Sequence, residues 1–245
     1  MRLDLYLVQS GIVRSRGRAA EAVRGGCVSV NGEICLKPSC DISPSDIVLA
    51  SDNADLPYVG RGGCKLFSAL KAFNIDMSGK ICLDIGASTG GFTDCMLQNG
   101  AKFVYSLDVG HFQLHEKLRA DKRVKCLEKT DIRQVAPSDF NPPPDFITAD
   151  VSFISLKLIL PKIKEFLGGG EAVLLIKPQF EAGRGFVGKN GLVKDIAVHR
   201  RVLEEIVMFC VNIDIKVKAI DFSPIKGGDG NIEYFMYITS PDSLY

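Results

Sequence analysis

Three charged residues stand at the ends of apolar, strand-like runs in the 245-residue chain. Asp150 ends one run in TADVSFIS, Lys177 ends the next in LLIKPQFE, and Glu233 opens the last in GDGNIEYFMY. A single residue of this kind is most often a surface charge. Three at one edge of a sheet indicate a shared site instead, and with a further lysine they have the types that can activate a hydroxyl group.

The further lysine is Lys65, in VGRGGCKLFSAL. The spacing of Leu66, Leu70 and Phe73 predicts a helix with one apolar side, and we expect Lys65 in its first turn. The helix dipole disfavours a cation there, which indicates another task for this side chain. Two lysines held by two carboxylates can orient a ribose 2′-hydroxyl, accept its proton or stabilise the forming alkoxide.

From about residue 61 onward, strand-like runs alternate with segments of helix length. This order predicts an α/β fold with a doubly wound, mainly parallel sheet, in which the last two runs form an antiparallel hairpin at one side. Ligands of such sheets bind outside the carboxyl ends of the strands. The expected strands are ICLDIG, KFVYSLDV, RVKCLEK, DFITADV, AVLLIKP, IKVKAIDF and EYFMYIT, with a helix at about 194–210 before the last two.

The turn GASTGG after the first of these strands predicts a cofactor site. A dinucleotide loop would need glycine where Ser88 stands, and the lysine of a phosphate-binding P-loop is missing. The pattern instead favours S-adenosylmethionine, which has no phosphate. The residues expected to contact this cofactor are Asp84, Gly86, Ser88, Thr89 and Gly90.

Two further acids follow the next two strands. Asp108 ends VYSLDVG about twenty residues beyond the loop, the spacing at which a carboxylate takes ribose hydroxyls. Asp131, in EKTDIR, is expected either near the adenine ring or at a helix N-cap, and the sequence favours neither position.

The first fifty residues predict a separate small α+β unit of two helices and a hairpin. Ser15 is the expected N-cap of the second helix, and Asn31 with Gly32 the expected hairpin turn. Charge alone is consistent with an RNA-binding face and equally with a solvated one. Only Glu21 opposes the arginines of this segment, which are Arg14, Arg16, Arg18 and Arg24.

Composition limits the remaining functions. The net charge of +1 argues against coating nucleic acid by bulk charge, so RNA would bind a local patch. No apolar run is long enough to cross a bilayer, and Asp4 interrupts what would be a signal-peptide core, so a cytoplasmic location is expected.

The eight cysteines form no CxxC pair and are expected to be reduced. His111 and His115 lack a third ligand, so no metal is expected.

Residues 141–144, NPPP, resemble the motif with which some methyltransferases hold a base amino group. Here the prolines precede the strand DFITAD instead of following it, so they shape the loop into that strand. No Pro-Cys pair supports covalent attack on a pyrimidine. These exclusions favour a ribose oxygen as the methyl acceptor.

The segments RLD, SRGRAAEAVRGGCVSVNG and KPS resemble the S-four RNA-binding domain. Nearly the whole chain resembles the TlyA family of ribosomal RNA ribose methyltransferases, also labelled haemolysins, whose catalytic domain is similar to the FtsJ (RrmJ) type. The resemblance implies an RNA-binding domain at 1–50, a linker at 51–60 and a seven-stranded, Rossmann-like methyltransferase domain at 61–245. It implies that Arg2, Arg14, Arg16 and Arg18 face RNA and that the catalytic tetrad is Lys65, Asp150, Lys177 and Glu233.

The activity that the resemblance implies is S-adenosylmethionine-dependent 2′-O-methylation of cytidine in ribosomal RNA. Ribosomal RNA or ribosomal subunits would be the partners, without a membrane or a metal. PYVGRGGCKL matches a segment thought to couple RNA engagement to cofactor binding in this family. Three residues depart from the family pattern: Phe112 replaces glycine, Asp131 asparagine and Gly228 proline.

Two other functions stay open at this point. The first is a non-catalytic ribosomal RNA-binding or assembly protein, against which the intact tetrad and Asp108 weigh. The second is a membrane-active haemolysin, which should carry a long apolar or a basic amphipathic segment that the sequence does not show.

Overall fold

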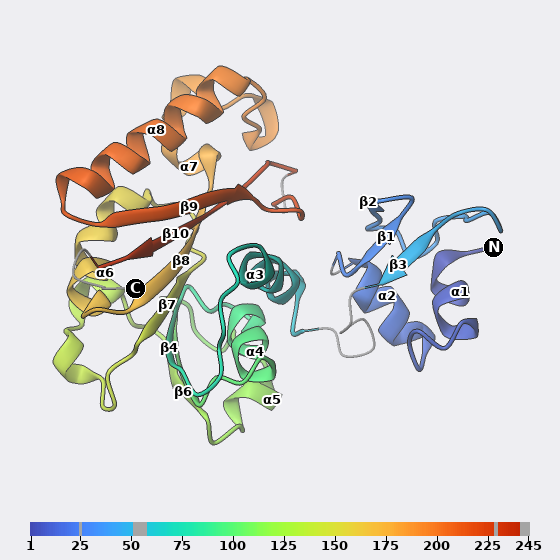
Figure 1. Cartoon of the computed structure of the whole chain (residues 1–245), viewed down its shortest axis with the longest axis horizontal. Coiled ribbons are helices and arrows are strands. Elements are labelled where there is room, and N and C mark those ends of the chain that lie inside the picture. Colours follow the sequence, from blue (N-terminus) through green and yellow to red (C-terminus); the bar gives the residue numbers. More distant parts are fainter. Residues whose placement is uncertain (25, 51–57, 228–229, 241–245) are drawn as a thin grey trace.

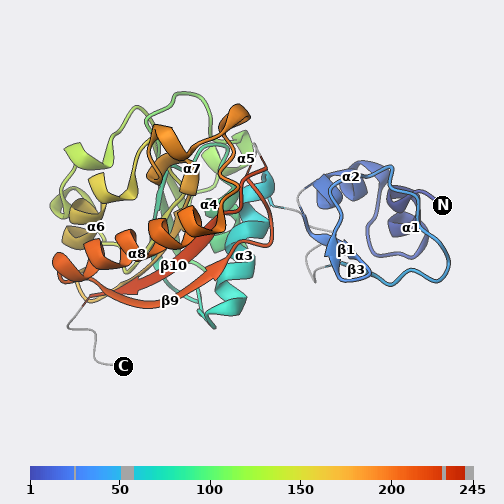
Figure 2. The ribbon, with the colours of Figure 1, turned by 90° about the horizontal axis from the view of Figure 1, so that it is seen from above.

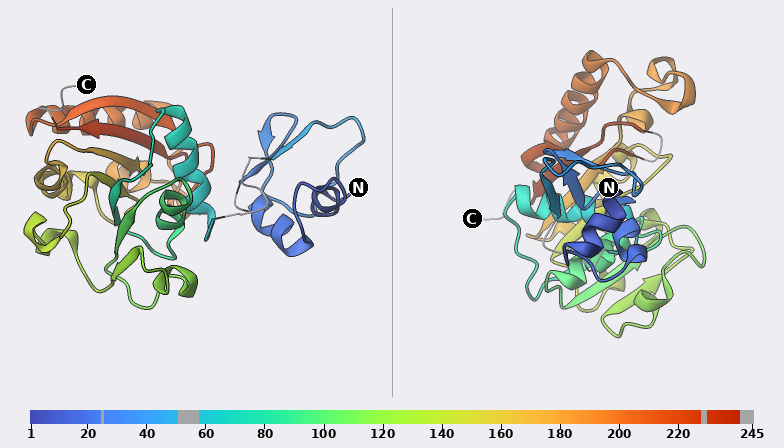
Figure 3. Two further views of the ribbon diagram at one scale, coloured as in Figure 1. Left: turned by 60° about the horizontal axis from the view of Figure 1, so that its bottom comes forward. Right: turned by 90° about the vertical axis from the view of Figure 1, so that its right-hand side faces the viewer.

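The computed structural model describes residues 1–24, 26–50, 58–227 and 230–240. A small module opens the chain and lies at one end of the molecule, beside a larger α/β domain (Figure 1; Figure 3, left). Its antiparallel sheet has the strand order β2-β1-β3. The elements of the module are α1 (Leu3–Gln9), α2 (Arg16–Arg24), β1 (Val28–Val30), β2 (Glu33–Ile34) and β3 (Val48–Ala50).

Local signals account for most of the module. The Ser15 hydroxyl accepts a hydrogen bond from the Arg18 backbone N–H at 3.3 Å, which confirms the predicted N-cap. Asn31 and Gly32 both have positive φ, as a two-residue hairpin turn of type I′ requires. Strand β3 was not predicted, because it pairs with β1 only after a long irregular segment and its central residue, Leu49, is exposed.

The larger domain is built on a seven-stranded sheet, as predicted, and all seven expected strands are present. Strand β10 pairs antiparallel with both β8 and β9, whereas the other neighbouring strands are parallel. In spatial order the strands are β6 (Val124–Leu127), β5 (Phe103–Leu107), β4 (Ile81–Ile85), β7 (Phe146–Ala149), β8 (Glu171–Ile176), β10 (Tyr234–Thr239) and β9 (Lys216–Phe222).

Helices cover both faces of this sheet (Figures 1 and 2). Alternate residues along each strand enter opposite cores, so Cys82 and Phe235 pack toward α3 and α4, while Leu83 and Met236 pack on the other face. The helices are α3 (Arg61–Ala72), α4 (Gly91–Gln98), α5 (Glu116–Arg119), α6 (Leu160–Leu167), α7 (Pro178–Glu181) and α8 (Ile196–Asn212).

One predicted position needs correction. Helix α3 begins at Arg61, so Lys65 is its fifth residue and lies beyond the first turn. Gly60, with φ of 74°, turns the chain into the helix one turn earlier than the apolar spacing indicates. The helix dipole therefore acts only weakly on Lys65. Of the predicted linker, residues 51–57 lie outside the described residues.

Candidate active site

Lys177 and Asp150 meet at the carboxyl ends of two neighbouring strands. Lys177 follows β8 and Asp150 follows β7, and Lys177 Nζ lies 2.6 Å from Asp150 Oδ1. Nζ also donates a hydrogen bond of 2.9 Å to the hydroxyl of Ser152, which sequence reasoning missed. The Asp150 contact is an ion pair without hydrogen-bond geometry, so the buried Oδ1 accepts no hydrogen bond from the described residues. Asp150 and Lys177 both line the hollow described below, so a ligand bound there would lie beside this pair.

Lys65 and Glu233 form a second pair. Lys65 Nζ donates to Glu233 Oε2 at 2.6 Å, and the two side chains are 10% and 3% exposed. Burial at this level excludes water, so neither charge has an alternative partner in solvent. Tyr234 of β10 pairs with Ile176 of β8. Glu233, one residue before Tyr234, therefore lies at the same end of the sheet as Lys177, one residue after Ile176. The sheet thus brings Asp150, Lys177 and Glu233 to one edge, as predicted, and α3 brings Lys65 there.

The glycine turn and the first pair line one hollow. The backbone needs glycine at two points, because a Cβ on Gly86 would lie 2.6 Å from the Asp150 carbonyl oxygen and one on Gly91 would lie 2.8 Å from the Val59 carbonyl oxygen. Ser88 also has positive φ, at 49°. The lining residues are Gly62, Gly86, Ala87, Ser88, Thr89, Gly91, Phe92, Asp150, Ser152 and Lys177.

Asp84 and Gly90 lie behind this hollow, not on its surface. Asp84 is completely buried, and its carboxylate accepts hydrogen bonds from the hydroxyls of Thr93 at 2.6 Å and Thr148 at 3.0 Å. Burial raises the pKa of Asp84 to about 6, although the two hydroxyls oppose this shift. Gly90, with φ of 96°, forms the left-handed end of the turn. Both residues therefore support the glycine turn without lining the hollow.

Asp108 is tied to the loop on the other side. Its Oδ2 accepts a hydrogen bond of 2.7 Å from the Ser88 backbone N–H, and its Oδ1 accepts one of 2.7 Å from Gly110 N–H. The carboxylate therefore stands at the carboxyl end of β5, directly beside the glycine turn. Each oxygen has a remaining lone pair for a ribose hydroxyl.

Asp131 occupies the cap position. Its Oδ1 accepts from Arg133 N–H at 2.9 Å, and the carboxylate pairs with the Arg133 guanidinium. These interactions lower the pKa of Asp131, chiefly through the Arg133 side chain. Of the two expected roles, the structure shows the N-cap, and Asp131 is not among the residues that line the hollow. A contact with the adenine ring stays a prediction.

Glu128 holds the loop that follows Asp108, a role that the sequence did not reveal. Its carboxylate accepts hydrogen bonds from the backbone N–H groups of Phe112, Gln113 and Leu114 and from Arg119. Burial acts to raise the pKa of Glu128, but these four donors outweigh it and lower the value to about 2. Phe112, where the family pattern has glycine, takes φ of 53°, a backbone conformation that glycine adopts without strain.

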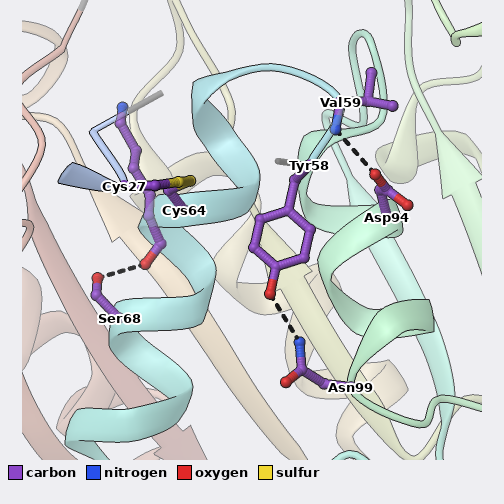
Figure 4. Close-up of a disulfide and its surroundings, with 8 residues drawn as sticks. Cys27, Tyr58, Val59, Cys64, Ser68, Asp94 and Asn99 are labelled. Carbon is purple, nitrogen blue, oxygen red and sulfur yellow. Dashed lines mark hydrogen bonds between the residues drawn. A yellow bond between two sulfur atoms is a disulfide. The ribbon is translucent and has the colours of Figure 1, made fainter. Parts of the chain in front are cut away.

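The segment before α3 is fastened to the cofactor loop's helix, α4 (Figure 4). Tyr58 is buried, and its hydroxyl accepts from the Asn99 amide at 3.2 Å. The Val59 N–H donates to Asp94 Oδ2 at 2.9 Å. Tyr58 and Val59, which lie just before α3, therefore contact both ends of α4. The coupling role that the family resemblance implies for this segment stays a prediction.

A disulfide joins Cys27, just before β1, to Cys64 in α3 (Figure 4). The expectation that the cysteines are reduced is therefore wrong for this pair. The bond links residues 37 positions apart, which no local spacing motif could indicate. Cys82, Cys95 and Cys210 are free and buried, as expected.

The predicted RNA-facing arginines are all exposed on the small module. Asp4, which is almost completely buried, organises two of them: it pairs with Arg2 at 2.8 Å and with Arg16 at 3.4 Å. The Arg2 hydrogen bond is the main cause that lowers the pKa of Asp4. Arg14 lies in the loop before α2 and Arg18 lies in α2, and both are exposed.

A doubly wound sheet with a glycine turn after its first strand and an acid after its second defines the class of Rossmann-like nucleotide- and cofactor-binding domains. The chain belongs to the FtsJ-like methyltransferase family, whose model matches residues 58–239, and the S4 domain model matches residues 1–48. The protein is thus an S-adenosylmethionine-dependent methyltransferase that carries an RNA-binding domain.

Relatives match nearly the whole chain. Hemolysin A of Brachyspira hyodysenteriae is 44% identical over 97% of this chain and 99% of its own length. The 16S/23S rRNA (cytidine-2′-O)-methyltransferase TlyA of Mycobacterium tuberculosis is 38% identical over 97% of this chain and 89% of its own. A solved structure from Streptococcus thermophilus is 46% identical, with a TM-score of 0.74 over 99% of this chain and 89% of that one.

Proposed function

We propose that this methyltransferase modifies the 2′-hydroxyl of a cytidine in ribosomal RNA. The small module supplies the RNA-binding surface, and the edge of the large sheet supplies the chemistry. The Mycobacterium relative carries this activity in its name. The proposed catalytic residues are Lys65, Asp150, Lys177 and Glu233.

The observation that carries the proposal is the pair Lys177–Asp150 at the mouth of the glycine-lined hollow. An alcohol is a weak nucleophile near neutral pH and needs a group to hold its proton. The Asp150 carboxylate lines the hollow and can accept the hydroxyl hydrogen, while the ammonium group of Lys177 beside it stabilises the negative charge that develops on the ribose oxygen. Ser152 fixes the direction of Nζ.

The residues around the hollow fit the cofactor. S-adenosylmethionine, when bound, supplies a methyl group that is already strongly electrophilic. Gly86 and Gly91 let the loop pack directly against the backbone of Asp150 and Val59, which shapes the wall of the hollow. The hollow measures about 190 Å³, enough for one end of such a molecule. We place the remainder along Asp108, whose carboxylate can take the ribose hydroxyls.

Lys65 and Glu233 act one layer behind this pair in the proposal. Gly62, three residues before Lys65, lines the hollow, so the position of α3 determines its wall. The buried ion pair joins α3 to the start of β10 and fixes that wall. Lys65, whose charge Glu233 neutralises, therefore acts through the position of α3.

An exposed aromatic residue stands next to the proposed site. Phe153, three residues after Asp150, is 91% exposed and has φ of 63°. Its ring centre lies 5.1 Å from that of Phe180, which lies in α7, three residues after Lys177. A base taken out of an RNA stack needs an aromatic surface of this kind, so we place the target cytosine against Phe153.

The test is transfer of a radiolabelled methyl group from S-adenosylmethionine to purified small and large ribosomal subunits of a methylation-deficient strain. After alkaline hydrolysis, label in alkali-resistant dinucleotides that disappears with Lys177→Ala supports ribose methylation. Label in mononucleotides would move the chemistry to a base. No transfer to either subunit, with the cofactor bound, would favour a non-catalytic RNA-binding protein.

The name of the Brachyspira relative supports one other candidate, a membrane-active haemolysin. In the described part of the chain, no helix is long and apolar enough to cross a membrane. Release of a dye from liposomes by nanomolar purified protein would support this candidate. Intact liposomes at micromolar protein would remove it.

A further inference from the structure

The segment between α7 and α8 carries unopposed positive charge (Figure 1, orange). Arg184, Lys189 and Lys194 are all exposed, and residues 182–194 contain no acid. The flanking acids are occupied, since Glu181 accepts from Ser155 and Leu156, and Asp195 caps α8. Residues 184–194, which we call the basic loop, therefore present a local positive field.

Several cations elsewhere on the described surface are paired with a carboxylate. Arg119, Arg123, Arg133, Lys157 and Lys162 each lie within 2.8 Å of a carboxylate oxygen. Within the described residues, none of the three cations of the basic loop forms an ion pair. Their charges remain available for a partner.

The basic loop is held against residues 231–234, the segment that contains Glu233 and leads into β10. Asn231, which is 1% exposed, accepts from Val193 N–H at 2.9 Å and donates to the Gly191 carbonyl at 2.8 Å. One residue after Glu233, the Tyr234 hydroxyl lies 2.9 Å from Nδ1 of His199.

The same imidazole reaches the loop from its other nitrogen. His199 Nε2 lies 2.9 Å from the Val193 carbonyl oxygen, so this nitrogen carries a hydrogen and donates to that oxygen. Asn231, two residues before Glu233, and Tyr234, one residue after it, therefore both connect to the loop. A flexible surface loop would have no need of such fastening, which costs the ordering of two polar side chains.

We propose that the basic loop is a second RNA-binding surface, which holds the phosphate backbone of the substrate beside the methylated nucleotide. This inference rests on the proposed function and adds a contact outside the small module. Phosphates are the charge complement of the three cations, and phosphate contacts fix register without reading sequence. Because the loop is fastened on both sides of Glu233, RNA held there is placed relative to the catalytic edge.

The test measures binding, not turnover. The variant Lys189→Ala/Lys194→Ala and the wild-type protein are titrated with purified ribosomal subunits at several salt concentrations. The matched control is Lys102→Ala/Lys122→Ala, which removes two exposed lysines before β5 and β6, at the opposite edge of the sheet. Thermal unfolding and S-adenosylmethionine binding show whether each variant is folded.

We expect Kd to rise about tenfold in the basic-loop variant and the slope of log affinity against log salt to fall by about 1.5, since each lost phosphate contact removes 0.7 to 0.9. Cofactor affinity stays at the wild-type value, and the control keeps both Kd and slope. An unchanged slope in the basic-loop variant overturns the inference. Failure of the proposed function is a separate result, because it appears as wild-type protein that binds subunits without methylating ribose.

Discussion

The ammonium group of Lys65 lies 2.6 Å from the carboxylate of Glu233, although 168 residues separate them in the sequence. Both side chains are buried, so each is the counter-charge that allows the other to stay ionised inside the protein. The pair thereby ties the first helix of the large domain to its last strand.

Removal of one member should therefore affect stability and activity together. Glu233→Gln leaves Lys65 buried without a counter-charge, and we expect the free energy of unfolding to fall by about 3 kcal/mol and methyl transfer by about 100-fold. Urea unfolding and single-turnover methylation measure the two effects. In the double variant Lys65→Met/Glu233→Gln, stability should recover by more than half without activity. Equal stability of the single and double variants would contradict the pairing.

Ser152 should act through Lys177 alone. Ser152→Ala removes one hydrogen bond to Nζ, worth about 1 kcal/mol, so kcat should fall about fivefold with little change in KM for RNA. Ser10→Ala, which loses a hydroxyl bonded to Tyr6 in the small module, is the matched control and should retain full activity. A purely structural role of Ser152 would instead show as a lower melting temperature at unchanged kcat.

Asp84 should make stability fall as the pH rises from about 4 to 6. Its pKa is about 6 in the folded protein, above the unfolded value of about 3.9, so the folded state binds more protons in this window. Relative to Asp84→Asn, wild-type protein should lose roughly 2 to 3 kcal/mol of unfolding free energy across it. Urea titrations at pH 4, 5, 6 and 7 measure both proteins. Parallel curves would show that the carboxyl group ionises normally.

The positive φ of Phe112 can be tested by comparing the stability of glycine and alanine variants at this position. At φ of 53°, Phe112→Gly should be about 1 kcal/mol more stable than Phe112→Ala, because alanine retains the strain. At exposed Val109, which does not have positive φ, the order should reverse by about 0.5 to 1 kcal/mol. Thermal unfolding of the four variants gives both differences. The same order at both positions would contradict the assigned conformation.

The sequence predicted the strands of the large sheet well, because their apolar runs are bounded by charged or glycine residues at which pairing ends. It also predicted that Asp150, Lys177 and Glu233 share one edge, since parallel topology forces the ends of β7 and β8 together. The partners of the two lysines could be identified only from the structure. Nothing in the local spacing shows that Lys177 pairs with Asp150 and Lys65 with Glu233.

Other features could not be predicted because they depend on packing between distant segments. Ser152 and Glu128 look like ordinary polar loop residues until their hydrogen-bond partners are known. Asp84 has the expected position in sequence, yet its side chain points into the core, since alternate residues of β4 face opposite sides of the sheet. The Cys27–Cys64 bond joins two parts of the molecule that no local pattern relates.

The order of strands β8, β10 and β9 has a consequence for synthesis. Among the described residues, β10 follows every other strand in sequence, but it enters the sheet between β8 and β9, which are made earlier. While β10 is still inside the ribosome's exit tunnel, Lys65 has no carboxylate to neutralise it and β8 has an open edge. A nascent chain therefore assembles the edge that holds Asp150, Lys177 and Glu233 only after β10 has left the tunnel.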